Sequence, residues 1–137
     1  MTISHVSDTA RWVAVYRAME TERPDAIFRD PFARALAGPE GERIVQEVAR
    51  GRSAAWAMTV RTAVFDELIL RAVRDEGVDR IVNLAAGLDA RPWRMELGAG
   101  VSWVDVDLPG ILDHKLDALR DETPRCAYRG LSADLTD

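Results

Sequence analysis

Three short stretches of the sequence have residue types that suit the binding of a nucleoside. Residues 85–89 read Ala-Ala-Gly-Leu-Asp, and such small residues let the backbone come close to a ligand. Asp107 stands twenty positions after Gly87, the usual separation for an acid that accepts both ribose hydroxyls of a nucleoside cofactor. Asp134 and Leu135 follow a further apolar run. Each stretch alone also fits an ordinary strand exit or a helix N-cap, but the three together favour one site.

Short apolar runs that alternate with helical patterns must position these stretches. The runs precede them directly, at residues 80–86, 101–107 and 126–131. Such runs are typical of strands in a buried parallel sheet, and ligands of open α/β sheets lie beyond the carboxyl ends of the strands. Pro109 begins a predicted helix between the second and third runs, with Lys115 on its solvent-facing side. The sequence therefore predicts an α/β fold with a parallel sheet and right-handed crossovers.

The chain before Asp79 has helical periodicity instead. The pattern predicts four helices: one through Trp12 and Met19, one from Asp30 to Gly38, one from Pro39 to Gly51, and a long one from Ser53 to Gly77. No repeat, low-complexity tract or Ser/Gly linker divides the sequence. We therefore expect an all-helical first part followed by a strand-containing second part.

Composition and charge exclude several classes of protein. The 137 residues include 18 Lys and Arg against 23 Asp and Glu, and the formal net charge of −5 argues against a nucleic-acid partner. Cys126 is the only cysteine, so a disulfide scaffold and a structural zinc site are excluded. Apolar runs stay short of the roughly 20 residues that a membrane span needs, and the start lacks a basic signal region. We expect a cytoplasmic protein that binds neither membrane nor nucleic acid.

Two longer motifs enclose the first two stretches. One reads Ile-Val-Asn-Leu-Ala-Ala-Gly-Leu-Asp-Ala-Arg-Pro-Trp-Arg at residues 81–94, and the other reads Val-Asp-Val-Asp-Leu-Pro at 104–109, followed by Lys115. Shorter matches lie at residues 7–10, 30–33, 61–62 and 134–135. Together they resemble the leucine carboxyl methyltransferase-like family, whose members are S-adenosyl-L-methionine-dependent enzymes with a Rossmann-like class I methyltransferase fold. The resemblance covers nearly the whole chain.

The resemblance implies which residues hold the methionine part of the cofactor. Arg61 matches an arginine that pairs with the methionine carboxylate, and a planar guanidinium suits that role. Ala85, Ala86 and Gly87 match the turn that lies under the methionine moiety. The family more often has Gly at the place of Ala85. Many S-adenosyl-L-methionine enzymes also have an acid where this chain has Asn83, so its affinity for the cofactor could be lower.

The resemblance also implies how the nucleoside part is held. Asp107 matches the acid that binds the ribose, and Leu108 packs beside it. Asp134 would accept a hydrogen bond from the adenine amino group, and the backbone amide of Leu135 would lie near a ring nitrogen. No metal ligand and no catalytic side chain is assigned.

A doubly wound sheet of this family has its strands in the order 3-2-1-4-5, and the sequence accounts for strands 1 to 3 only. We therefore expect a chain without its C-terminal half, divided into an N-terminal helical segment, residues 1–78, and the first half of a Rossmann-like S-adenosyl-L-methionine-binding domain, residues 79–137. The first strand then has one unpaired edge. Self-association, or pairing with a separately supplied C-terminal half, is expected through that edge.

The function implied is methyl transfer to the oxygen of a carboxylate or hydroxyl, on a small molecule or a carboxyl terminus. Two other classes stay open. A nicotinamide-dependent oxidoreductase half-domain would also place an acid twenty residues after a small-residue turn, but residues 85–90 lack the second and third glycines that admit a pyrophosphate. A non-catalytic binding or scaffold protein would keep the fold without the reaction.

Overall fold

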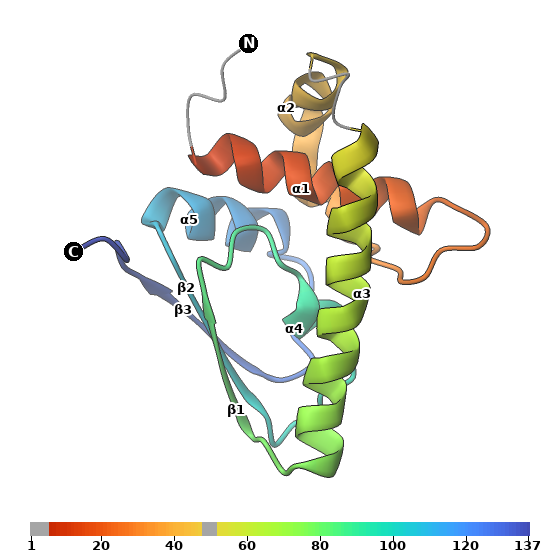
Figure 1. Cartoon of the computed structure of the whole chain (residues 1–137). Helices are drawn as coiled ribbons and strands as arrows, with labels where there is room; N and C mark the ends of the chain where they lie inside the picture. The colour runs from red at the N-terminus through yellow and green to blue at the C-terminus, as the bar shows by residue number, and fades with distance from the viewer. Residues whose placement is uncertain (1–5, 48–51) are drawn as a thin grey trace. The chain divides into compact units, whose positions relative to one another are not determined.

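The computed structural model describes residues 6–47 and 52–137 (Figure 1). It consists of two compact units, Met1–Phe65 and Asp66–Asp137, which are described separately below. The functional division into residues 1–78 and 79–137 stays a prediction. Within the described residues, none of the helices is both long and apolar enough to span a membrane.

Helices make up the described part of the first unit: α1 (Val6–Thr21), α2 (Ala33–Glu47) and the beginning of α3 (Arg52–Asp75). α1 packs against α2, and apolar side chains of both helices are buried there: Ala14, Val15, Ala18, Leu36 and Ile44. Asp30 precedes α2 and accepts hydrogen bonds from the backbone amide of Phe32 at 3.1 Å and from Nε of Arg17 at 3.0 Å. Asp30 therefore holds the turn before α2, and the helix begins at Ala33, three residues after its predicted start at Asp30.

The helix break predicted at Gly38 is confirmed. Gly38 has a φ of 62° and a ψ of −178°, which are not helical values, so α2 consists of two helical segments on either side of this residue. The long helix predicted from Ser53 to Gly77 is found as α3, and its last residue is Asp75. The helix end predicted at Gly51 lies outside the described residues, as does the side chain of Ser53.

The second unit contains the sheet. Its elements after α3 are β1 (Arg80–Leu84), α4 (Arg91–Arg94), β2 (Ser102–Asp107), α5 (Pro109–Ala118) and β3 (Ala127–Ser132). The three strands are parallel and lie in the order β1-β2-β3, so the predicted strand order 3-2-1 is confirmed. The register aligns Leu84, Val106 and Leu131, which brings the carboxyl ends of all three strands to one edge. This is the Rossmann-like α/β architecture that the sequence predicts.

The core of the second unit lies on one face of the sheet. Trp103 of β2 is 1% exposed and packs with Met95, Leu97 and Val101, while residues 69, 70 and 73 of α3 cover this cluster. α5 lies on the same face, since Lys115 bonds to Asp105, whose side chain points to the same side as that of Trp103.

The opposite face of the sheet is open in the described part of the chain. Val82 is 63% exposed, Leu84 61% and Leu131 43%. The first run was predicted as a strand of the kind found in a buried parallel sheet, but in this structure β1 is covered on one face only. The physical reason is that α3, α4 and α5, the described helices of this unit that contact the sheet, do so on the side of Trp103.

Candidate functional site

The small-residue stretch forms a tight turn directly after β1. Ala85 has a φ of 52° and Gly87 a φ of 55°, and both values lie in the left-handed region. Glycine adopts that region freely, whereas an alanine there carries backbone strain, so surrounding contacts must hold Ala85 in place. The amide of Ala86 donates to the carbonyl of Val106 at 3.3 Å, and the amide of Asp89 donates to the carbonyl of Ala86 at 3.2 Å. The turn is thus tied both to β2 and to itself.

Asp107 lies beside this turn, at the last position of β2. The amide of Gly87 donates to Oδ2 of Asp107 at 2.7 Å, and the amide of Leu108 donates to Oδ1 at 2.7 Å. Asp107 is 7% exposed, and each of its carboxylate oxygens retains a second lone pair. A carboxylate held in this way can accept hydrogen bonds from two neighbouring hydroxyls. The two acceptor oxygens of Asp107 therefore fit a ribose ring next to the turn.

The third stretch follows β3 at the same edge of the sheet. The amide of Ala133 donates to the carbonyl of Asp107 at 3.0 Å, which ties the end of β3 to the end of β2. Asp134 is exposed and accepts hydrogen bonds from the hydroxyl of Thr136 at 2.6 Å and from its amide at 2.9 Å. These two bonds lower the pKa of Asp134, so the carboxylate stays ionised. Leu135 is 52% exposed.

The structure thus brings most of the predicted site residues to one edge of the sheet. Ala85, Ala86 and Gly87 form the turn beside Asp107, and Leu108 is the N-cap of α5. Asp134 and Leu135 begin two residues after β3, with their side chains exposed. Arg61 belongs to the first unit, where it is exposed on α3. Its pairing with a methionine carboxylate stays a prediction.

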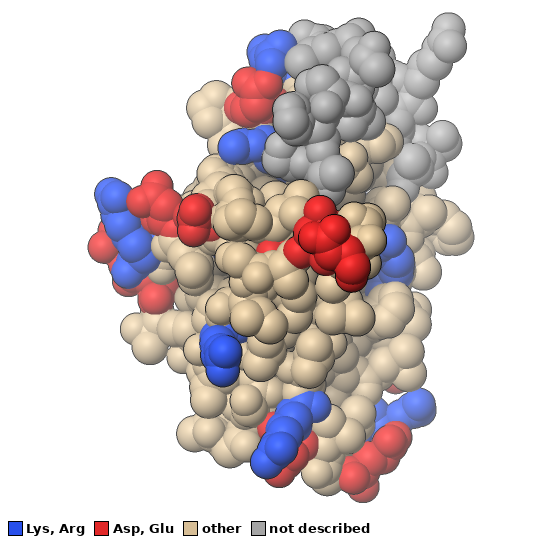
Figure 2. All heavy atoms as spheres, turned by 90° about the vertical axis from the view of Figure 1, so that its left-hand side faces the viewer, with Lys and Arg blue, Asp and Glu red and all other residues tan. Residues whose placement is uncertain are grey.

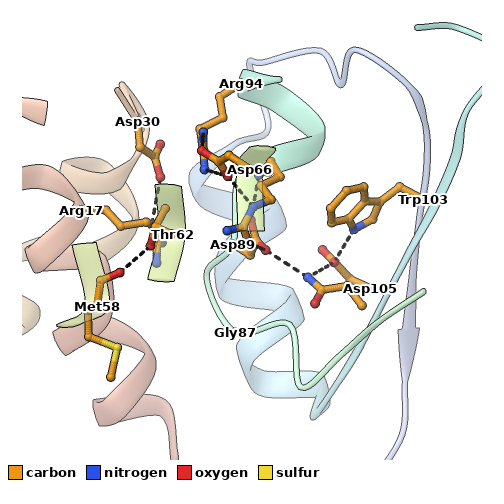
Figure 3. A network of polar contacts seen from close by, with 12 residues as sticks. Arg17, Asp30, Met58, Thr62, Asp66, Gly87, Asp89, Arg94, Trp103 and Asp105 are labelled. Carbon is orange, nitrogen blue, oxygen red and sulfur yellow. Dashed lines mark hydrogen bonds and ion pairs between the residues drawn. The ribbon is translucent and has the colours of Figure 1, made fainter. Parts of the chain in front are cut away.

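A buried polar cluster behind the turn was not predicted from the sequence (Figure 3). Asp105 of β2 is fully buried and accepts four hydrogen bonds. Its Oδ1 accepts from Nε1 of Trp103 at 2.8 Å and from Nδ2 of Asn83 at 3.1 Å, while Oδ2 accepts from Nζ of Lys115 at 2.6 Å and from the hydroxyl of Tyr128 at 2.8 Å. All lone pairs of this buried carboxylate are therefore used.

Lys115 was predicted on the solvent-facing side of its helix, and this prediction is wrong. Its side chain is 0% exposed, as is that of Asp105, with which it forms an ion pair. The reason is that Asp105 offers a buried negative charge at the level of Lys115, which compensates for the lost hydration of the ammonium. Position on a helix does not reveal such a partner on a strand.

Asn83 has a role that an acid could not fulfil. Its Nδ2 donates both to Oδ1 of Asp105 at 3.1 Å and to Oδ2 of Asp89 at 3.2 Å. The side-chain amide therefore bridges two carboxylates. An aspartate at this position would have no proton to donate at neutral pH. The absence of an acid here is thus compatible with the local chemistry of the turn.

Arginines extend the cluster outward from Asp89. Nη1 of Arg91 donates to Oδ2 of Asp89 at 2.6 Å, and its Nε donates to Oδ1 of Asp66 at 2.7 Å. Arg94 donates two hydrogen bonds to Asp66, both at 2.7 Å (Figure 3). Burial by itself would lower the pKa of Arg91, but the charges of Asp89 and Asp66 raise it. The part of α3 around Asp66 is therefore fixed to α4.

On the face drawn in Figure 2, Lys and Arg side chains stand singly or next to Asp and Glu, without a continuous basic patch. Among the described residues, no group of three or more His, Cys, Asp and Glu side chains is arranged to hold a metal ion. The candidate site is therefore built from backbone amides, small residues and carboxylates.

Comparison with known proteins places the chain in a family. The model of the family described as leucine carboxyl methyltransferase matches residues 10–137. The chain is 38% identical to a protein of Mycobacteroides abscessus and 39% identical to one of Parafrankia sp., and these alignments cover 98% and 96% of the chain but 47% and 46% of the relatives. A protein of Streptomyces coelicolor is 40% identical over 87% of the chain and 44% of its own length. All three carry the name "Putative S-adenosyl-L-methionine-dependent methyltransferase".

A match over nearly the whole chain shows that this protein belongs to the leucine carboxyl methyltransferase family. The chain spans about half the length of the curated relatives that it matches.

Proposed function

We propose that this chain supplies the S-adenosyl-L-methionine-binding half-site of a methyltransferase. The observation that carries the proposal is the hydrogen bond from the amide of Gly87 to Oδ2 of Asp107, which joins a small-residue turn to a nearly buried carboxylate. A ligand bound at this edge of the sheet would contact both a backbone turn without bulky side chains and a carboxylate that can accept ribose hydroxyls. The names of the relatives support S-adenosyl-L-methionine as that ligand.

The residues of the chain bind and orient the cofactor. Asp107 accepts the ribose hydroxyls, and the backbone of residues 85–87 lies against the methionine part. Asp134 accepts the adenine amino group, with the amide of Leu135 beside the ring, and Arg61 pairs with the methionine carboxylate. When bound, S-adenosyl-L-methionine supplies a methyl group that is already activated on its sulfonium. The protein then needs only to align an acceptor and exclude water.

The acceptor is an oxygen, of a carboxylate or a hydroxyl group. The description of the family, leucine carboxyl methyltransferase, supports a carboxylate. A carboxylate is ionised at neutral pH and can attack the methyl carbon without a general base.

Calorimetric titration of the chain with S-adenosylhomocysteine and with NAD tests the proposal. We expect S-adenosylhomocysteine to bind and NAD not to bind. Binding of NAD alone would replace the proposal by an oxidoreductase half-domain, and binding of neither would contradict a nucleoside site. Binding of S-adenosylhomocysteine without methyl transfer, even with the C-terminal half of a relative added, would favour a non-catalytic binding protein.

We further propose that β1 is the edge through which the chain associates with a second copy or with a separate C-terminal half. Among the described strands, β1 pairs only with β2, and its Val82 and Leu84 are exposed. An exposed edge without Lys or Pro is a template for another strand. Sedimentation at micromolar concentration should show a species larger than the monomer, and Val82→Lys should reduce it. A wild-type chain that stays monomeric alone and also does not bind the C-terminal half of a relative would contradict this proposal.

A further inference from the structure

We infer that Lys115 is a positioning residue for the cofactor-binding turn: anchored by Asp105 in the core, it holds the backbone of residues 85–89 in the conformation that receives the ligand. The inference rests on the proposed function, because it assigns the turn to S-adenosyl-L-methionine. Lys115 itself does not touch the ligand in this proposal. It acts through the carbonyl oxygen of Asp89.

The geometry gives Lys115 two partners in different elements. Nζ donates to Oδ2 of Asp105 at 2.6 Å and to the carbonyl oxygen of Asp89 at 3.0 Å. Asp105 belongs to β2, whereas Asp89 is the last residue of the turn after β1. The ammonium therefore links the turn to the central strand. Because both side chains of the ion pair are 0% exposed, water does not compete for these bonds.

Stability alone does not account for the ion pair. A buried pair can often be replaced by apolar side chains of similar volume without loss of stability. Asp105 also receives hydrogen bonds from Trp103, Asn83 and Tyr128, so Lys115 is one of four donors. An apolar side chain could not replace the hydrogen bond that Lys115 donates to the carbonyl of Asp89. This is the bond by which Lys115 holds the turn.

The turn needs such a restraint. Ala85 is held at a φ of 52°, which an alanine adopts only when other contacts impose it. The turn is fixed at its start by the bond from Ala86 to Val106 and in its middle by the bond from Gly87 to Asp107. Lys115 fixes the backbone at its end. Without this third tie, the strain at Ala85 would favour rearrangement of the turn.

Lys115 also couples the turn to the ribose side of the site. It lies on α5, seven residues after the N-cap Leu108, which is about two helical turns and therefore the same helix face. The N-terminal end of this helix carries the Leu108 amide that bonds to Asp107. One side chain thus connects the helix behind the ribose acid with the end of the methionine turn.

The test is the double variant Lys115→Met with Asp105→Asn, which removes both charges together and leaves no unpaired buried ion. Tyr128→Phe is the matched control, because it removes another donor to the same carboxylate oxygen of Asp105 but none from the turn. Three quantities are compared at neutral pH in the full chain: the midpoint of thermal unfolding, the exchange rate of the Gly87 amide proton by NMR, and the Kd for S-adenosylhomocysteine. Lys115→Leu with Asp105→Asn likewise leaves no donor to the carbonyl of Asp89 and serves if the methionine variant does not fold.

We expect the double variant to unfold near the wild-type temperature, to exchange the Gly87 amide about tenfold faster, and to bind S-adenosylhomocysteine about tenfold more weakly. Tyr128→Phe should match wild type in exchange and affinity. A folded double variant with unchanged exchange, or with unchanged affinity, would overturn the inference. Failure of the wild-type chain to bind S-adenosylhomocysteine would instead contradict the proposed function, while the Gly87 exchange would still decide whether Lys115 holds the turn.

Discussion

The amide of Gly87 donates a 2.7 Å hydrogen bond to Oδ2 of Asp107, although twenty residues separate the two in sequence. The bond connects the turn after β1 with the last residue of β2, and Asp107 binds the amide of Leu108 with its other oxygen. The carboxylate is therefore oriented before any ligand arrives. Preorganisation of this kind reduces the cost of ordering a site on binding.

Asp107→Asn should weaken the binding of S-adenosylhomocysteine about ten- to a hundredfold. The amide group keeps one acceptor oxygen but replaces the other by a donor, and the loss of a charged hydrogen-bond partner typically costs about 1.5–3 kcal/mol. Isothermal titration calorimetry measures the change. Asp113→Asn is the control, because Asp113 is an exposed carboxylate on α5. Equal affinities of Asp107→Asn and wild type would remove the ribose assignment.

Arg61→Lys should reduce affinity for S-adenosylhomocysteine but not for an analogue without the methionine carboxylate. The ammonium keeps the positive charge and loses the two-pronged geometry that a carboxylate accepts. Competition titrations with both ligands measure the difference. Arg71→Lys, at another exposed arginine of α3, is the control and should leave both affinities unchanged. If Arg61→Lys affects both ligands equally, or neither, Arg61 does not bind the carboxylate.

Asn83→Asp should destabilise the protein by about 1–3 kcal/mol, the cost of leaving buried polar groups unpaired. The substitution removes the donor that bridges Asp89 and Asp105, and it adds a third carboxylate next to them. Asn83→Ala removes the donor without adding charge, so it should cost less. Urea unfolding of the two variants measures the order. An aspartate variant as stable as wild type would show that the Asn83 bridge is dispensable.

The stability of the protein should fall in alkaline solution because of Tyr128. Burial, and then the negative charge of Asp105, raise the pKa of the Tyr128 phenol. The unfolded chain loses this proton near the ordinary phenol pKa of about 10, whereas the folded chain retains it. The contribution of Tyr128 is therefore fully present below about pH 10 and is lost as the pH rises toward the folded-state pKa.

Urea unfolding of wild type and Tyr128→Phe between neutral pH and about pH 11 tests this expectation, because the variant cannot ionise at this position. The difference in free energy of unfolding between the two proteins should be constant below about pH 10 and should shrink above it. A difference that stays constant over the whole range would mean that Tyr128 titrates alike in both states.

The strands and the ends of the site could be predicted from the sequence because each depends on local signals. An apolar run that ends in Asp107, or in the small residues after Leu84, identifies a strand and its carboxyl end without knowledge of any distant contact. Parallel pairing followed from the alternation of strand and helix, and the order of the strands followed from the doubly wound sheet that the family resemblance implies. The prediction that the turn and Asp107 lie side by side is therefore confirmed.

The polar cluster behind the turn could not be predicted in this way. Lys115 and Asp105 are ten residues apart on different elements, and only the packing of α5 on the sheet shows that they meet. A lysine on an amphipathic helix is ordinarily solvent-exposed, so the sequence pattern placed Lys115 on the solvent-facing side of its helix. The short helix α4, Arg91–Arg94, was missed because four residues are too few to show a helical period.

The strand order has a consequence for how the site opens. β2 has a hydrogen-bonded neighbour on both sides, whereas β1 and β3 each have one among the described strands, and both edge strands carry exposed apolar side chains. Local unfolding of the sheet should therefore begin at the edge strands and reach β2 last. The methionine turn follows the edge strand β1, whereas the ribose acid is the last residue of the central strand β2. A ligand that contacts both would stabilise mainly the edge strand, so its binding would reduce local unfolding of β1.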